Sequence, residues 1–262
     1  MSYWIHNLPI GWMAVVYFGL TYLVSAGIYV FVIFFAHSVH AHARVVSSSM
    51  LSPAGTLFAL FVVFTAAQVW NDNDRANSAV AQEASSLRAM ALLAAAFPGE
   101  PESQLKTLVH EHIQRAVNEE WPMLAHGTAT LTMVPHELDE ALQIVLSLKP
   151  NGQGQEIAQR EMVAQLESAL DARRQLILIS HSAVSAVKWT CLGIEAICVL
   201  LILAAVHCHN RVAAMFSMAI FATGAAACFF LIGAYDRPFV GERAIGPVPL
   251  LHVMPEATRP PR

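Results

Sequence analysis

The chain has 262 residues, of which 56% are hydrophobic and only 13% are charged, and its formal net charge is −4. The charged share is about half that of a soluble globular chain, which excludes an ordinary water-soluble fold. Residues 72–188 hold most of the charges, and this segment is strongly acidic. It therefore offers no basic surface for phosphate groups, and we expect no nucleic-acid binding.

Two long apolar segments open the chain. Residues 10–36 contain no charged side chain, and as a helix they exceed the ~30 Å hydrocarbon core of a membrane. Ser52 and Pro53 have the pattern of a helix N-cap and a first helical residue, so the second span is predicted over 53–70. No glycine or proline lies between Asn71 and Phe97. The second helix is therefore predicted to continue from Pro53 to Phe97.

The middle segment is predicted to be a bundle of helices, because none of it alternates like a half-buried strand. After the break at 98–101, a helix is expected that ends or kinks at Trp121-Pro122. Further helical periodicity runs over 124–148, with an interruption at Pro135. A loop is predicted at 149–155 and a long helix over 156–180. The apolar face of the first of these helices is predicted to comprise Leu105, Leu108, Val109, Ile113 and Val117.

Two more apolar stretches, 189–206 and 212–234, predict a hairpin of a third and a fourth span. The fold class is therefore an all-α membrane protein with four spans and a helical domain between the second and third. The predicted segments are 1–70, 71–188, 189–235 and a tail, 236–262. Basic residues lie mainly on the side of the middle segment and the termini. By the positive-inside rule, this side faces the cytoplasm, and we expect a multi-pass protein of the cell inner membrane.

Several residues stand at the joints of this arrangement: Trp70, Ala76, Glu83, Glu120, Trp121, Arg173, Arg174, Trp189, Asp236, Arg237, Pro238, Phe239 and Gly241. With these residues in this order of spans, the chain resembles the bestrophin-like family of uncharacterised bacterial membrane proteins, which is defined by a domain of unknown function. The likeness covers nearly the whole chain, and 236–241 is its most specific part. More remotely, the chain resembles bestrophin ion channels, which implies a homo-oligomer (a pentamer) that passes inorganic ions through a pore lined by the second span.

In the second span, Leu57, Phe61, Phe64 and Gln68 share one helical face. The resemblance implies that such a face forms a hydrophobic neck that gates by dewetting. The alternative is that these side chains face lipid or neighbouring helices. They are the pore and gate candidates. Acidic residues such as Asp72 and Asp74 would favour cations if they face the pore.

Glu195 is an acid within the third span, where an ionisable group costs a few kcal/mol. It either lines an ion path or packs as a neutral, hydrogen-bonded carboxyl.

Histidines gather at the two short loops and are weak candidates for a metal site, because their spacing matches no structural zinc pattern. These are His37, His40, His42, His207 and His209. We therefore expect no metal and no cofactor.

Two further histidine pairs do not predict a catalytic site. His110 and His112 are two residues apart and point in different directions, unlike the zinc ligands of a metalloprotease. His136 and Glu140 have the right spacing, but acids after Pro135 also suit a helix N-terminus. A nucleophile elbow and a phosphate loop are both missing from the sequence, so an enzyme is not expected.

The motif at 236–241 suggests a lock between the tail and the bundle. We expect Phe239 to pack against the bundle and Asp236 to pair with Arg173 or Arg174. The sequence thus favours an oligomeric channel of bestrophin-like design. The alternative is a membrane-anchored signalling or scaffold protein whose helical domain binds a partner.

Overall fold

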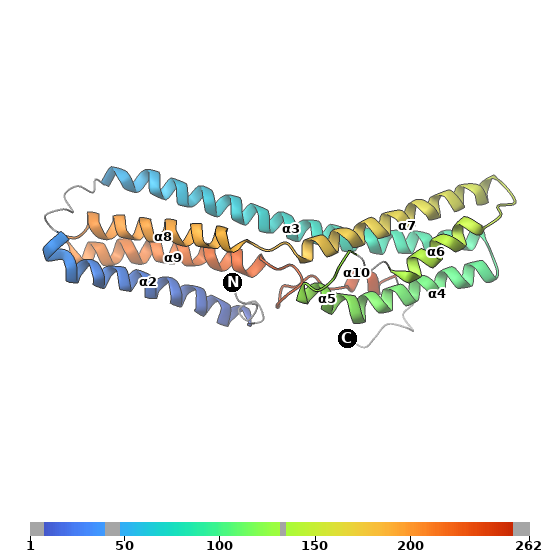
Figure 1. Ribbon diagram of the computed structural model, residues 1–262, viewed down its shortest axis with the longest axis horizontal. Helices are drawn as coiled ribbons and strands as arrows, with labels where there is room; N and C mark the ends of the chain where they lie inside the picture. The colour runs from blue at the N-terminus through green and yellow to red at the C-terminus, as the bar shows by residue number, and fades with distance from the viewer. Residues whose placement is uncertain (1–7, 40–47, 132–134, 254–262) are drawn as a thin grey trace. The chain divides into compact units, whose positions relative to one another are not determined.

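The computed structural model describes residues 8–39, 48–131 and 135–253, with the backbone alone for 33–39. All regular structure in these ranges is helical (Figure 1). Contacts divide the chain into two compact units. The first, here called the membrane unit, comprises Met1–Asn71, Ala183–Arg237 and Gly241–Arg243. The second, here called the bundle unit, comprises Asp72–Ser182, Pro238–Val240 and Ala244–Arg262.

The membrane unit contains helices α2 (Ile10–Val39), α8 (Ala186–Val206) and α9 (Arg211–Tyr235), together with the first half of α3 (Leu51–Leu93). All four are long and apolar enough to cross a membrane, which confirms the predicted spans. Figure 1 shows α2 beside α9 and α8. The side of α3 that carries Phe58, Ala66 and Val69 packs against apolar residues of α8 and α9.

Helix α3 differs from its prediction at both ends. It begins at Leu51, after a 3₁₀ turn at Ser48–Met50, so Ser52 is a helical residue and not the N-cap. Pro53 is then the third helical residue, which the helix tolerates because the N–H groups of a first turn have no intrahelical acceptor. The helix ends at Leu93 and is followed by a 3₁₀ turn, Ala94–Ala96.

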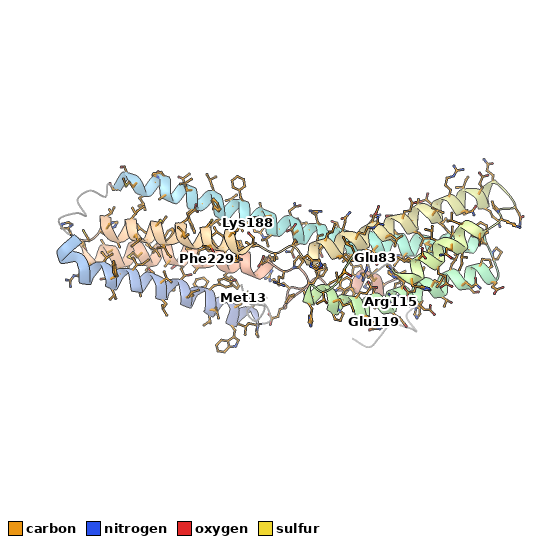
Figure 2. All side chains as sticks on the ribbon, in the orientation of Figure 1. Met13, Glu83, Arg115, Glu119, Lys188 and Phe229 are labelled. Carbon is orange, nitrogen blue, oxygen red and sulfur yellow. The ribbon has the colours of Figure 1, made fainter. Side chains whose placement is uncertain are left out.

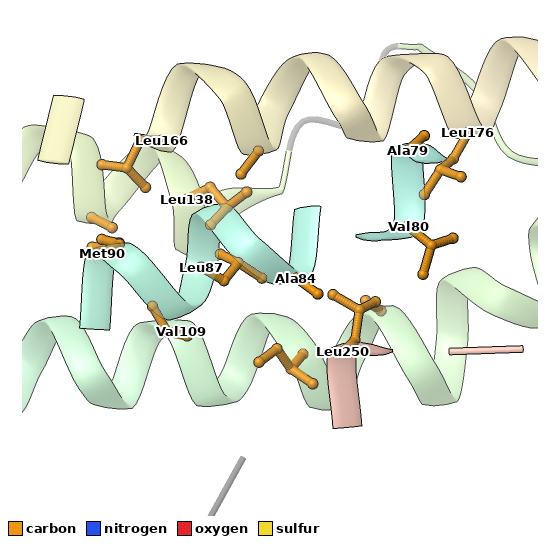
Figure 3. Close-up of a cluster of buried hydrophobic side chains, with 14 of the residues drawn as sticks. Ala79, Val80, Ala84, Leu87, Met90, Val109, Leu138, Leu166, Leu176 and Leu250 are labelled. Carbon is orange, nitrogen blue, oxygen red and sulfur yellow. The ribbon is translucent and has the colours of Figure 1, made fainter. Parts of the chain in front are cut away.

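The bundle unit contains the second half of α3 with α4 (Glu100–Arg115), α5 (Trp121–His126), α6 (His136–Ser147), α7 (Gln153–Ser180) and the short α10 (Val248–Leu251). Its core joins all of these helices, and Figure 3 shows Leu87, Leu138, Leu166 and Leu250 in it. The predicted apolar face of α4 is confirmed, since Leu105, Leu108, Val109 and Ile113 are buried.

Two helix boundaries in this unit were predicted wrongly, and a third prediction allowed either an end or a kink at Trp121-Pro122. The helix does not end there, because a π-helical turn at Ala116–Glu120 joins α4 to α5, and such a turn is an irregularity at which helices kink. The helix ends instead at Gly127, whose φ of 65° closes the last turn. Residues 127–131 and 135 are therefore not helical, although helical periodicity was predicted over 124–148, and 132–134 lie outside the described residues. Helix α7 begins at Gln153, inside the predicted loop.

Candidate functional site

The predicted pore face of α3 is exposed within the membrane unit. Leu57 and Phe64 are 57% and 71% exposed and Phe61 is 39% exposed, whereas Phe58 and Thr65 on the other side of the helix are buried. Because α8 and α9 cover only the other side of α3, the side with these bulky residues has an apolar surface that is available to lipid, a pore or another protein chain.

The polar end of this face is fixed by a neighbouring helix. The ammonium group of Lys188, on α8, donates a short hydrogen bond to the side-chain oxygen of Gln68 (Figure 2 labels Lys188). Both residues are half-buried. Because the Gln68 side chain is neutral, this hydrogen bond does not neutralise the positive charge of Lys188. The residue pattern alone did not indicate this pair.

Glu195 lies two helical turns beyond Lys188 on the same side of α8. One carboxyl oxygen, Oε2, is buried and has no hydrogen-bond partner among the described residues. A buried oxygen without a partner is costly in a membrane. If Glu195 packs as a neutral, hydrogen-bonded carboxyl, the described part of the chain supplies no partner for this oxygen.

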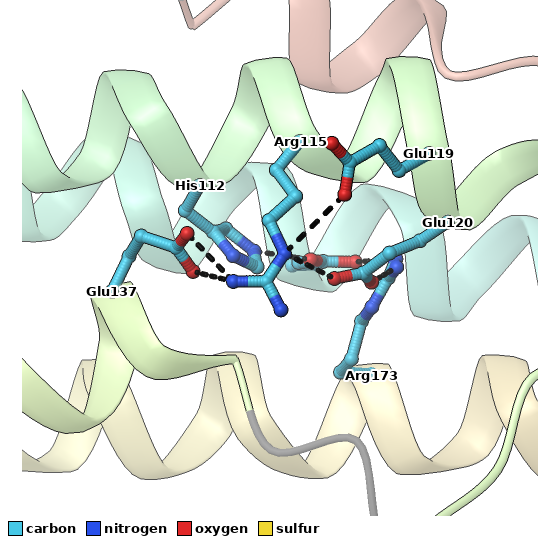
Figure 4. A network of polar contacts seen from close by, with 7 residues as sticks. His112, Arg115, Glu119, Glu120, Glu137 and Arg173 are labelled. Atoms are coloured by element: carbon cyan, nitrogen blue, oxygen red, sulfur yellow. Dashed lines mark hydrogen bonds and ion pairs between the residues drawn. The ribbon is translucent and has the colours of Figure 1, made fainter.

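In the bundle unit, residues from four helices meet in a buried network (Figure 4). His112 Nε2, on α4, lies 2.9 Å from Glu83 Oε1, on α3, and both side chains are 0% exposed. His110, two residues earlier, is instead only partly buried and contacts Gln114 on its own helix. The two histidines thus point apart, as predicted, and His112 serves the packing of α4 against α3.

Arg173, on α7, is the cation at the centre of this network. Its side chain is 3% exposed; Nη2 makes a close ion pair with Glu120, and Nη1 lies 3.7 Å from Glu83 Oε2. Burial lowers the pKa of Arg173 from its ordinary value, the charge of Glu83 raises it, and Arg115 lowers it further. An arginine stays charged under such conditions. The two buried carboxylates are therefore held by one buried guanidinium.

Arg115 extends the network towards α6. Its Nη1 lies 2.7 Å and 2.9 Å from the two carboxyl oxygens of Glu137, and its Nε lies 3.8 Å from Glu120. Burial alone would raise the pKa of Glu137, but its own backbone N–H and Arg115 outweigh this effect and lower the pKa. Glu137 thus lies in the first turn of α6, as predicted, and also binds a second helix.

The structure brings together three residues of the family resemblance that are far apart in the sequence: Glu83, Glu120 and Arg173. Sequence reasoning did not single out the roles of His112 and Arg115. A signal for His112 was present, because it lies between Leu108, Val109 and Ile113 on the apolar face of α4. A polar residue on such a face is buried and needs a partner.

The motif at 236–241 contributes to both units. In the membrane unit, the carboxylate of Asp236 accepts a hydrogen bond from the backbone N–H of Val184 at 2.6 Å. In the bundle unit, Phe239 packs edge-on against Trp121, with ring centroids 6.0 Å apart. The Trp121 indole donates to the Ile245 carbonyl. The expected packing of Phe239 is therefore seen, and Gly241 has a φ of 89°, which favours glycine.

The expected pairing of Asp236 with Arg173 or Arg174 stays a prediction, because Asp236 belongs to the membrane unit and both arginines belong to the bundle unit. Arg173 belongs to the buried network, and Arg174 is exposed and pairs with Asp171 of its own helix at 3.1 Å. The two neighbouring arginines have different environments because successive residues of a helix point about 100° apart, so that Arg173 faces the core and Arg174 faces outward.

The remaining family residues have simpler surroundings. Ala76 is fully buried, which allows close packing, and Trp70 is 48% exposed. Trp189 stacks on Tyr17 of α2 and contacts Phe229 of α9. The backbone carbonyl of Pro238 accepts a hydrogen bond from the backbone N–H of Ile245. Arg237 lies just after α9 and has a buried side-chain nitrogen.

The candidate metal ligands do not form a cluster in the described part of the chain. His207 contacts a backbone carbonyl of its own helix, and His209 Nδ1 lies 3.2 Å from Cys208 Sγ. Groups of three or more metal-binding side chains are absent from the residues that the structure describes. The side chains of His37, His40 and His42 lie outside the described residues. His136 and Glu140 form an exposed pair at 3.7 Å.

The fold and these sites define an all-α membrane protein in which a helix of the membrane unit continues into a helical bundle. The chain belongs to the bestrophin-like family, because the family model for the bestrophin-like domain matches residues 18–250. No curated protein matches the sequence.

Solved structures show the same fold. The chain is similar to two crystal structures of a bacterial bestrophin homologue from Klebsiella pneumoniae, each with one residue changed to threonine. The variant in which an isoleucine is replaced is 12% identical to this chain, with a TM-score of 0.68, and the match covers 92% of this chain and 97% of that one. The variant in which a leucine is replaced is 14% identical, with a TM-score of 0.64, and the match covers 92% of this chain and 98% of that one. A further membrane protein is 15% identical, with a TM-score of 0.65 and the same coverage.

Proposed function

We propose that this protein is an oligomeric ion channel whose pore is lined by α3. One observation carries the proposal: within a chain of the bestrophin-like family, the face of α3 with Leu57, Phe61 and Phe64 is left uncovered by the other three spans. A symmetric assembly around this face would place one copy of the apolar row from each subunit around a central axis.

Such a row would act as a hydrophobic constriction. Bulky apolar rings exclude water from a narrow pore, so ions pass only when the constriction widens. Gln68, held by Lys188, ends the row, and Asp72 follows it by one helical turn. Asp72 and Asp74 would concentrate cations at this mouth. Glu195, with its unsatisfied oxygen, would lie beside the ion path.

The assembly and orientation follow from the resemblance and from the distribution of charge. We propose a homo-oligomer, a pentamer by the resemblance, in the cell inner membrane. The bundle and both termini would face the cytoplasm, because the basic residues near the span ends lie on that side.

The test is ion flux into liposomes that contain the purified protein, with K⁺ and Cl⁻ measured separately over a range of pH and calcium. Phe61→Ala should increase flux by removing bulk from the constriction, and Glu195→Gln should alter it. Absence of flux for every ion tested would overturn the proposal and favour an anchor or scaffold role.

A labelling experiment tests the pore lining itself. In a background without the four native cysteines, Phe61→Cys should react with a charged thiol reagent added from the aqueous phase, and the reaction should block flux. The matched control is Leu23→Cys on α2, which is 71% exposed in the structure. Equal reaction at both positions, or reaction without block, would contradict a pore lined by α3.

A further inference from the structure

A pocket in the bundle unit has no role in the proposed channel. It lies between the second half of α3 and α4 and has a volume of about 590 Å³, within the range of small-molecule sites. Leu92, Val109 and Ile113 contribute to its apolar lining. Leu92 is 69% exposed, so a large apolar side chain is presented at this site.

Three basic side chains line the same pocket. Arg88 comes from α3, and Lys106 and His110 come from successive turns of α4. None of the described residues that line the pocket is acidic. A lining with basic and no acidic side chains is unusual in a segment whose net charge is strongly negative. These basic groups give the pocket a positive potential next to its apolar lining.

Arg88 is the most available of these groups. Within the described ranges it makes no hydrogen bond or ion pair. Lys106 pairs with Glu102, one turn away on its own helix, and both remain partly exposed. His110 contacts Gln114. An incoming anion would therefore find one unengaged guanidinium and a lysine held only by an exposed pair, which costs little to exchange.

We propose that this pocket binds a single-chain anionic amphiphile, a carboxylate with an alkyl tail. The tail would cover Leu92, Val109 and Ile113, and the carboxylate would bind Arg88 and Lys106. Burying apolar surface favours the tail by about 25 cal/mol per Å². A guanidinium prefers a carboxylate because two parallel hydrogen bonds can form. Binding at this pocket would not require that the protein conducts ions.

The test is photolabelling of the full-length protein in nanodiscs with dodecanoate that carries a diazirine near the end of its tail. Mass spectrometry should place the label on peptides covering 88–95 and 106–113, and unlabelled dodecanoate should compete. The double variant Arg88→Gln, Lys106→Gln should lower this labelling about fivefold or more. Arg88→Lys with Lys106 intact should retain most of it.

Matched controls distinguish binding of the carboxylate in this pocket from apolar adsorption and from binding of a lipid headgroup. Arg160→Gln removes an exposed arginine of α7 outside the pocket and should leave labelling unchanged. A dodecanol probe, which lacks the charge, should label these peptides weakly. Equal labelling by dodecanol, equal labelling of the double variant, or label confined to the membrane helices would overturn the proposal. Loss of the label when the nanodisc contains phosphatidylglycerol would assign the pocket to lipid headgroups instead and likewise overturn it.

Discussion

His112 Nε2 lies 2.9 Å from Glu83 Oε1, and neither side chain is exposed. This contact joins α4 to the half of α3 that lies in the bundle unit, and Arg173 brings α7 to the same carboxylate. Buried charges are tolerated only when they are paired. The packing of α3, α4 and α7 against one another therefore depends on a few buried charged residues.

Removing the central cation of this network should be strongly destabilising. Arg173→Ala removes the guanidinium that Glu83 and Glu120 share, leaving Glu83 with His112 and Glu120 with the more distant Arg115. Breaking a buried pair in this way costs about 3–5 kcal/mol. Arg174→Ala is the matched control, because the Arg174 side chain is 69% exposed and its partner among the described residues is Asp171 of the same helix. It should cost less than about 1 kcal/mol. Thermal unfolding of the protein in detergent measures both. Similar melting temperatures for the two variants would show that the network is not structural.

A glycine in α9 should be intolerant of a methyl group. A Cβ at Gly233 would lie 2.6 Å from Cζ of Tyr17 on α2, closer than real contacts. Gly233→Ala should therefore push α2 from α9 and destabilise the membrane unit by about 1–3 kcal/mol. Gly224→Ala on the same helix meets no atom within 4 Å and should be tolerated. If the two alanine variants unfold at the same temperature, Tyr17 does not pack against Gly233.

The contact between Arg115 and Glu137 should make the stability of the bundle depend on pH. The pKa of Glu137 is lowered in the folded protein, so its contribution is present above the unfolded value, about 4.5, and is lost as pH falls through the folded value. Glu137→Gln should cost roughly 1 kcal/mol at pH 7. This difference from the unchanged protein should shrink as the pH is lowered below about 4.5. A difference that does not vary with pH would argue against the ionised pair.

Trp121 should contribute to stability through two separable contacts. Trp121→Phe retains an aromatic ring against Phe239 but removes the indole N–H, leaving the buried Ile245 carbonyl without this donor, and should cost about 1–3 kcal/mol. Phe239→Ala empties a buried position and should cost about 3–5 kcal/mol. Chemical unfolding measures both. A larger loss for Trp121→Phe than for Phe239→Ala would indicate that the hydrogen bond outweighs the ring packing.

The sequence determined the helical class, the four spans and the continuation of the second span into the middle segment. These properties depend on apolar length and on where glycine and proline occur, and both are local features of the chain. The same local rules misplaced the start of α3 near Ser52 and the start of α7 at Gln153, and they did not predict that α5 ends at Gly127. At these helix ends, neighbouring residues provide the backbone hydrogen bonds in a way that the residue pattern does not specify.

Only the tertiary structure decided which polar residues meet. Glu83, Glu120 and Arg173 were singled out by resemblance, but their common network with His112 requires α3, α4 and α7 to pack side by side. The pairing of Lys188 with Gln68 similarly joins two helices that are more than one hundred residues apart. Side-chain chemistry states that a buried charge needs a partner, and the packing of distant helices determines which partner it finds.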